Sequence, residues 1–196
     1  MDIKNFYLAH CESFYKAYPA VRERFSDKRA LTALKIISKL STGLLYAAYI
    51  IGFFARGYSV LGKKTTYGVH DAMFFIAPAL TFFATTVIRS GINAKRPYER
   101  YDLVPLILKS TKGKSCPSRH TACAFAVAFA YLFGSSSDIG FDFILGALFL
   151  IAAVTVAVSR PLAGVHFPLD VVFGAVIAVV CFGVTFAVYM LCAPIL

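Results

Sequence analysis

The chain has 196 residues, a formal net charge of +10, a mean hydropathy of +0.70 and 59% hydrophobic residues. This apolar share exceeds that of soluble globular domains and predicts an integral membrane protein that crosses the cell membrane several times. The positive charge alone would suit nucleic acid. However, the basic residues stand at the ends of apolar runs, where anionic membrane lipids are the nearer partner, so we expect no nucleic-acid partner.

Residues 1–30 form a segment with its own character. Apolar and aromatic side chains recur every three or four residues from Tyr7 to Phe25, and basic residues gather near the end of this stretch. The pattern predicts an amphipathic helix that lies on the membrane surface or caps the bundle and is broken at Pro19. A poorly ordered basic tail is the alternative. The segment lacks a central apolar region, so we expect no cleavable signal peptide.

Residues 31–196 are expected to form one transmembrane domain. They contain five long blocks without charge: residues 40–55, 72–88, 121–137, 143–159 and 171–196. With flanking side chains that reach the interface, each block approaches the roughly 20 residues that a helix needs to cross a bilayer. The blocks are continuously apolar and do not alternate like the strands of a barrel. The predicted fold class is therefore all-α, a transmembrane helical bundle of about five spans.

Three polar clusters stand at the ends of these blocks, at residues 89–97, 117–120 and 159–170. If consecutive spans alternate in direction, all three clusters share one membrane face. Charged side chains near membrane depth are costly, and they are a functional-site hypothesis by default. We therefore expect one polar site at this face.

The clusters hold far more arginine than acid. Guanidinium groups match phosphate oxygens with paired hydrogen bonds, so the predicted ligand is a phosphate group. Ser118 precedes an apolar block and is placed to cap that helix, whose N-terminal amides would also bind an anion. The predicted phosphate-binding residues are Arg89, Arg96, Ser118, Arg119 and Arg160. The alternative, ordinary snorkelling at the membrane boundary, is adopted for Lys109, Lys112, Lys114 and Arg100.

Two histidines add chemistry to this binding site. His166 lies four residues before Asp170, so on one helical turn the carboxylate could accept from one ring nitrogen and leave the other as a nucleophile. His120, on a different span, could protonate a departing oxygen. The predicted catalytic residues are thus His166, His120 and Asp170. His10 and His70 are interpreted as structural.

At these positions the chain resembles the type 2 phosphatidic acid phosphatase family, which shares its pattern with glucose-6-phosphatases and vanadium haloperoxidases. The resemblance covers roughly residues 72–180. The matching motifs, in chain order, are Arg89 with Arg96-Pro97, then Pro117-Ser118-Arg119-His120, then Ser159-Arg160 with His166 and Asp170. Two positions depart from the family pattern: Arg89 replaces its usual lysine and Arg119 replaces its usual glycine.

The resemblance implies a membrane phosphatase that uses no metal and no other cofactor. His166 would form a phosphohistidine, Asp170 would orient it, and His120 would protonate the leaving oxygen. The remaining polar residues of the motifs would hold the phosphoryl oxygens. Arg119 would either reach the second phosphate of a diphosphate or face the headgroups. The expected substrate is a lipid phosphate: undecaprenyl diphosphate, phosphatidylglycerol phosphate or phosphatidic acid.

Two questions stay open at this point. A non-catalytic phospholipid-binding or transport protein on the same fold is the alternative function, although binding alone needs neither a nucleophile nor an acid. The positive-inside rule would place the basic, site-bearing face in the cytosol, whereas many bacterial members of the family face outward. The sequence gives no basis for predicting the oligomeric state.

Overall fold

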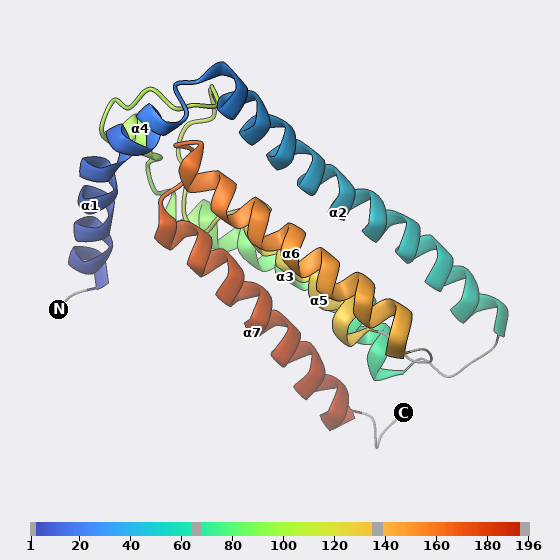
Figure 1. Ribbon diagram of the computed structural model, residues 1–196. Helices are drawn as coiled ribbons and strands as arrows, with labels where there is room; N and C mark the ends of the chain where they lie inside the picture. The colour runs from blue at the N-terminus through green and yellow to red at the C-terminus, as the bar shows by residue number, and fades with distance from the viewer. Residues whose placement is uncertain (1–2, 64–67, 135–138, 193–196) are drawn as a thin grey trace.

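The structure, a computed structural model, describes residues 3–63, 68–134 and 139–192. These residues form helices and connecting loops, and they contain no strand. The helices are α1 (Ile3–Arg24), α2 (Lys28–Lys63), α3 (Val69–Ile92), α4 (Pro97–Arg100), α5 (Arg119–Phe133), α6 (Ile139–Leu162) and α7 (Pro168–Cys192) (Figure 1). The predicted all-α class is confirmed.

Four helices are long and apolar enough to cross a membrane: α2, α3, α6 and α7. The fifth predicted span corresponds to α5, which has only 15 residues. At 1.5 Å per residue it rises about 22 Å, less than the roughly 30 Å of a bilayer core. The predicted block extended to residue 137, and its last three residues lie outside the described part of the chain.

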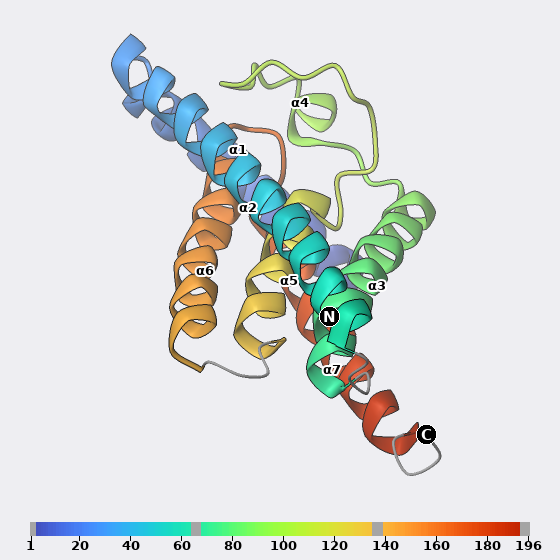
Figure 2. The same ribbon diagram turned by 90° about the vertical axis from the view of Figure 1, so that its right-hand side faces the viewer.

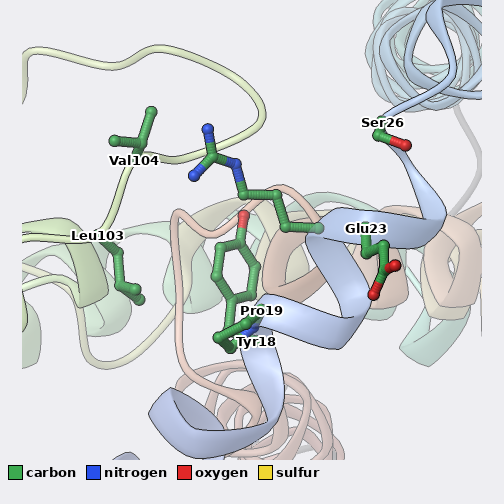
Figure 3. A pocket seen from close by; sticks show the side chains of 7 residues that line it. Tyr18, Pro19, Glu23, Ser26, Leu103 and Val104 are labelled. Atoms are coloured by element: carbon green, nitrogen blue, oxygen red, sulfur yellow. The ribbon is translucent and has the colours of Figure 1, made fainter.

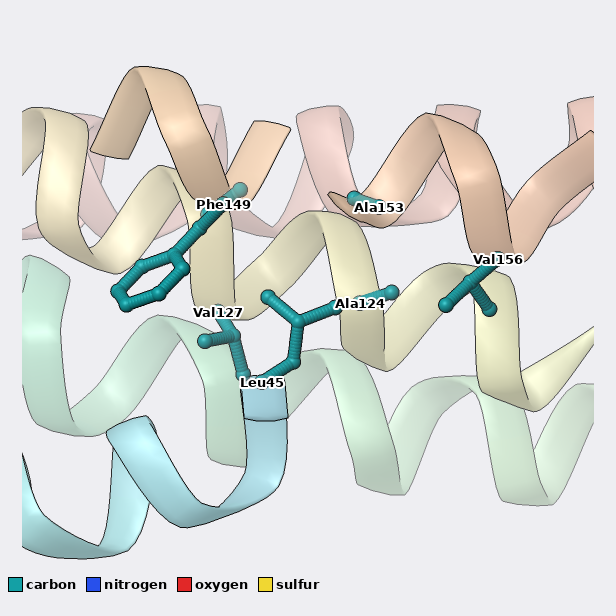
Figure 4. Packing of buried hydrophobic residues seen from close by; sticks show 7 residues of the cluster. Leu45, Ala124, Val127, Phe149, Ala153 and Val156 are labelled. Atoms are coloured by element: carbon teal, nitrogen blue, oxygen red, sulfur yellow. The ribbon is translucent and has the colours of Figure 1, made fainter. Parts of the chain in front are cut away.

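The short helix α5 is the centre of the bundle. It contacts α2, α3, α6 and α7, and Figure 2 shows α6 and α3 on either side of it. Its buried face is rich in alanine, which lets neighbouring helices approach closely. Figure 4 shows larger side chains filling the space between α5, α2 and α6, with Val127 facing Leu45 and Phe149. The N-terminus of α5 is therefore held at a fixed place inside the bundle.

The ends of four helices meet at one end of the bundle: the C-termini of α3 and α6 and the N-termini of α5 and α7 (Figure 1). A direct link joins two of them, because the backbone N–H of Ser118 donates to the carbonyl of Asp170 at 2.8 Å. At Gly174 an added Cβ would lie 2.6 Å from the Ser118 carbonyl oxygen, so only glycine permits this close approach of α7 to α5. The prediction that the three polar clusters share one face is confirmed.

Helix α1 lies at the same end and contacts α7. The predicted break at Pro19 is wrong: α1 runs through Pro19 to Arg24. Proline removes one backbone donor, but tertiary contacts hold this turn. Tyr18 is 1% exposed, and its hydroxyl accepts from the Leu106 N–H at 3.3 Å. The chain leaves the helix only after Arg24, and α2 already begins at Lys28, inside the predicted N-terminal segment.

Candidate active site

The loop of residues 101–118 crosses the site end of the bundle and is fastened to the segment that follows α3. The Glu99 carboxylate accepts hydrogen bonds from the backbone N–H groups of Arg96 (2.9 Å) and Gly113 (2.8 Å). The N–H of Ser115 donates to the carbonyl of Ala94 at 2.9 Å. Residues 113–115 are thereby fixed beside the first polar cluster.

The two arginines of the first cluster brace this loop. Arg96 is 2% exposed, and its guanidinium donates to the carbonyls of Gly113 and Val165, both at 3.1 Å. Arg89 is also buried and donates to the carbonyl of Lys114. Hydrogen bonds from charged donors are worth about 1.5–3 kcal/mol each. Arg96 therefore joins the loop after α4 to the loop before α7.

His166 stands between Asp170 and Arg96. Its Nδ1 lies 3.5 Å from Asp170 Oδ2, and its Nε2 lies 3.4 Å from Arg96 Nη1. The histidine is 1% exposed and the aspartate 0%. The expected pairing is present, but not on one helical turn, because His166 precedes α7, which begins at Pro168. Asp170 accepts from the N–H of Phe167 at 3.0 Å, so the carboxylate also closes the first turn of α7.

The environment of His166 favours its neutral form. Burial lowers the pKa of His166 to about 4, the contact with Asp170 opposes this shift, and the charge of Arg96 adds to it. In a neutral ring that donates from Nδ1 toward Asp170, Nε2 carries the lone pair, which accepts a long hydrogen bond of 3.4 Å from Arg96 Nη1. That nitrogen faces the arginine, where an anion would also bind. The arrangement can attack an electrophile held beside Arg96.

The second cluster forms the start of α5. His120 is the second residue of this helix, and its electrostatic neighbours include Arg160, Lys109 and His166. Ser118 occupies the N-cap position, but the expected side-chain cap is absent from the described structure. Its Oγ instead accepts a hydrogen bond from the Thr121 hydroxyl at 3.0 Å. The first amides of α5 therefore lack the cap that the sequence predicted.

The remaining two arginines approach from other directions. Arg160, on α6, donates to the Thr42 hydroxyl of α2 at 3.0 Å. Its Nε is buried and has no hydrogen-bond partner among the described residues. The guanidinium of Arg119 lies over the ring of Phe82, 5.5 Å from its centroid. Phosphate binding by these residues stays a prediction.

Three residues near the site were not expected there. Lys109, interpreted as a snorkelling residue, is partly buried. Burial lowers its pKa to about 8, and the charges of Arg96 and Arg160 add to the shift. Ser115 donates to Asp170 Oδ2 at 2.5 Å, and Tyr7 donates to Asp170 Oδ1 at 2.7 Å. None of the three belongs to a motif, and only the fold brings them to the site.

A cavity of about 430 Å³ opens beside the site, between α1 and the 101–118 loop. Figure 3 shows Leu103 and Val104 on one side and Glu23 and Ser26 on the other. None of its lining residues is a predicted site residue. The cavity is therefore separate from the histidine pair.

Comparisons with known proteins identify the family and the fold. The family model of the PAP2 superfamily matches residues 72–192. Among solved structures, the chain is similar to Aquifex aeolicus LpxE, with 22% identity, a TM-score of 0.63, and 88% of this chain and 93% of that chain covered. It is also similar to a transmembrane PAP2-type phosphatidylglycerolphosphate phosphatase from Bacillus subtilis, with 19% identity, a TM-score of 0.44, and 90% and 94% covered. A search of curated proteins found no match.

The family match spans more than half of the chain and includes all three polar clusters. The likeness to LpxE adds that the fold extends over most of the chain. The chain therefore belongs to the PAP2 superfamily and is a membrane phosphatase of that family.

Proposed function

We propose that the protein removes the terminal phosphate from a lipid phosphate or lipid diphosphate through a phosphohistidine at His166, without a metal or other cofactor. One observation carries this proposal: His166 turns one ring nitrogen to Asp170 and the other to Arg96. A buried, neutral imidazole held in this way suits nucleophilic attack on an anion bound by arginine.

The reaction has two displacement steps. In the first, the Nε2 lone pair of His166 attacks phosphorus, the bond from phosphorus to the leaving oxygen breaks, and His120 gives that oxygen a proton. In the second, His120 takes a proton from water, the water oxygen attacks phosphorus, and the electron pair of the phosphorus–nitrogen bond returns to Nε2. Asp170 stabilises the imidazole while it carries positive charge in the intermediate.

Arginines from separate segments of the chain support binding of the phosphoryl oxygens. Arg89 comes from the last turn of α3, Arg96 precedes α4, and Arg160 comes from α6 with an unpaired Nε. The first amides of α5 add donors beside Ser118. Charge in the phosphoryl transition state spreads over the equatorial oxygens, so donors fixed on separate helices are suited to stabilise it.

The position of the site supports a lipid substrate. It lies at the end of a bundle whose outer surfaces on α2, α3, α6 and α7 expose large apolar side chains. A phosphate attached to a hydrocarbon tail can approach such a site while the tail stays in the membrane. The candidate substrates are undecaprenyl diphosphate, phosphatidylglycerol phosphate and phosphatidic acid.

Purified protein in detergent should release inorganic phosphate from at least one of these three lipids, and a water-soluble phosphate monoester should be a poorer substrate. EDTA should leave turnover intact, because no step is assigned to a cation. Binding of these lipids without phosphate release would favour the phospholipid-binding or transport alternative. Loss of activity in EDTA and recovery in magnesium would contradict the proposed chemistry.

A further inference from the structure

The N-terminal helix α1 reaches the centre of the site through one hydroxyl group. Tyr7 Oη donates to Asp170 Oδ1 at 2.7 Å, across most of the length of the chain. Burial raises the pKa of Tyr7 well above its usual value, and the Asp170 carboxylate raises it further. The phenol therefore stays protonated at neutral pH and acts as a donor.

The two oxygens of Asp170 have different partners. Oδ2 accepts from the Ser115 hydroxyl and the Phe167 N–H, and it is also the oxygen that faces His166 Nδ1. Oδ1 accepts from Tyr7. A carboxylate held at both oxygens cannot rotate freely about its bond to Cβ. Tyr7 thus fixes the plane of the group that in turn sets the direction of the imidazole.

Packing delivers Tyr7 to this position. The Tyr7 ring meets Phe167 edge-on, with centroids 6.2 Å apart, and the Phe14 ring meets Phe167 in the same way at 5.7 Å. Cys11, between these two residues on the helix, is fully buried. Helix α1 therefore packs against Phe167, the residue between His166 and the start of α7. This packing holds α1 in place beside the site.

We infer that Tyr7 is a positioning residue of the active site, and that α1 completes the site by holding the Asp170 carboxylate in the plane that His166 requires. This inference rests on the proposed function, because it assumes that His166 and Asp170 act together. It gives the N-terminal segment, which lies outside the family match, a role in the reaction.

The test is Tyr7→Phe, which keeps the ring and removes only the hydroxyl. We expect kcat to fall about tenfold with KM nearly unchanged, as for loss of one hydrogen bond to a charged group. Tyr18→Phe is the matched control. It also removes a hydroxyl that ties α1 to the bundle, but that hydroxyl bonds to the backbone at Leu106 and Leu162 and does not bond to Asp170. Its kcat should stay within about twofold of the parent protein, even where its melting temperature falls.

A double-mutant cycle separates positioning from general support. In an Asp170→Ala background, which has no oxygen for Tyr7 to bond and is assayed with a substrate that has a good leaving group, Tyr7→Phe should have little further effect on kcat. An equal loss in both backgrounds, or an equal loss in Tyr18→Phe, would overturn the inference, as would parent-like kcat in Tyr7→Phe. Full activity in His166→Ala and Asp170→Asn would instead overturn the proposed function, so the two failures are distinguishable.

Discussion

The two sides of the site are built differently. On the side of the proposed nucleophile, His166, Asp170 and Arg96 are almost completely buried and are bonded to one another or to backbone groups of two loops. On the opposite side, His120 is partly exposed, Arg119 rests on a phenyl ring, and Arg160 retains an unpaired buried nitrogen. The first side is thus preorganised by the protein, while the second side has bonding capacity left for a ligand.

This difference separates two kinds of residue. A change on the nucleophile side should damage chemistry and packing together, because the same hydrogen bonds serve both. A change on the opposite side should damage substrate binding or leaving-group departure with less effect on folding.

The largest expected effect is the loss of the nucleophile. His166→Ala should lower turnover on the order of a thousandfold or more for every substrate, because it removes one member of a cooperating unit. His120→Ala should lower turnover strongly for lipid substrates but much less for a phosphate ester with a good leaving group, which needs no proton. Steady-state rates of the purified variants check both predictions. His10→Ala, at an exposed position, is the control. Near-parental rates in folded His166→Ala would rule the mechanism out.

The arginines should differ in their effect on stability. Orthovanadate can adopt a five-coordinate geometry that resembles the phosphoryl transition state. Arg96→Ala and Arg160→Ala should each reduce turnover and orthovanadate affinity by about a hundredfold, since both arginines would hold the equatorial oxygens of that geometry. Only Arg96→Ala should also lower the melting temperature markedly, because it frees the buried carbonyl of Val165 and the partly buried carbonyl of Gly113. Lys112→Ala, at an exposed loop position, should change none of these quantities. Unchanged vanadate affinity in both arginine variants would contradict the assignment.

The protonation state of His166 tests the buried side directly. Burial disfavours the cation, so the folded resting protein should keep His166 neutral at pH 6 and protonate it only near pH 4. Arg96→Ala should raise this pKa, because a nearby positive charge is removed. Nitrogen chemical shifts of labelled histidine, assigned with His166→Ala, check both statements. A pKa of His166 near the ordinary value of histidine would show that water reaches this side chain and would contradict its burial in the structure.

The smallest expected effect is at Arg119. Its guanidinium lies over the exposed Phe82 ring, and no described hydrogen bond directs it toward the histidine pair. Arg119→Gln should therefore lower kcat/KM by about tenfold or less, and more for a diphosphate than for a monophosphate. Equal effects on both substrate classes would indicate that Arg119 faces the headgroups.

The apolar blocks and the alternation of spans were sufficient to predict the helical bundle and the shared face of the three clusters. Motif spacing also predicted the pairing of His166 with Asp170, although the helical turn assumed for it was wrong, because Pro168 starts α7 after the histidine. The sequence predicted a break in α1 from the helix-breaking tendency of Pro19 alone. The contact that holds Tyr18 in the helix joins α1 to Leu106, and the local sequence gives no sign of it.

The contributions of Tyr7, Ser115 and Lys109 could not be predicted for a related reason. Each acts through a contact between segments far apart in the chain, and none carries a local pattern that marks it. The Ser118 cap was expected from position alone, whereas the side chain bonds to Thr121. Local sequence patterns therefore predicted that His166, Asp170 and the arginines lie in one site, but not the contacts that Tyr7, Ser115 and Lys109 add to it.

The most direct test of the account is to trap the intermediate. Protein mixed with a lipid phosphate labelled at the terminal phosphorus should be quenched in alkali within one turnover, digested, and analysed for the labelled peptide. If the phosphoryl group passes through His166, alkali-stable, acid-labile label should appear on His166, with and without EDTA, and should be absent in His166→Ala. Label on another residue, or single-turnover phosphate release with no labelled protein at any time, would contradict this mechanism.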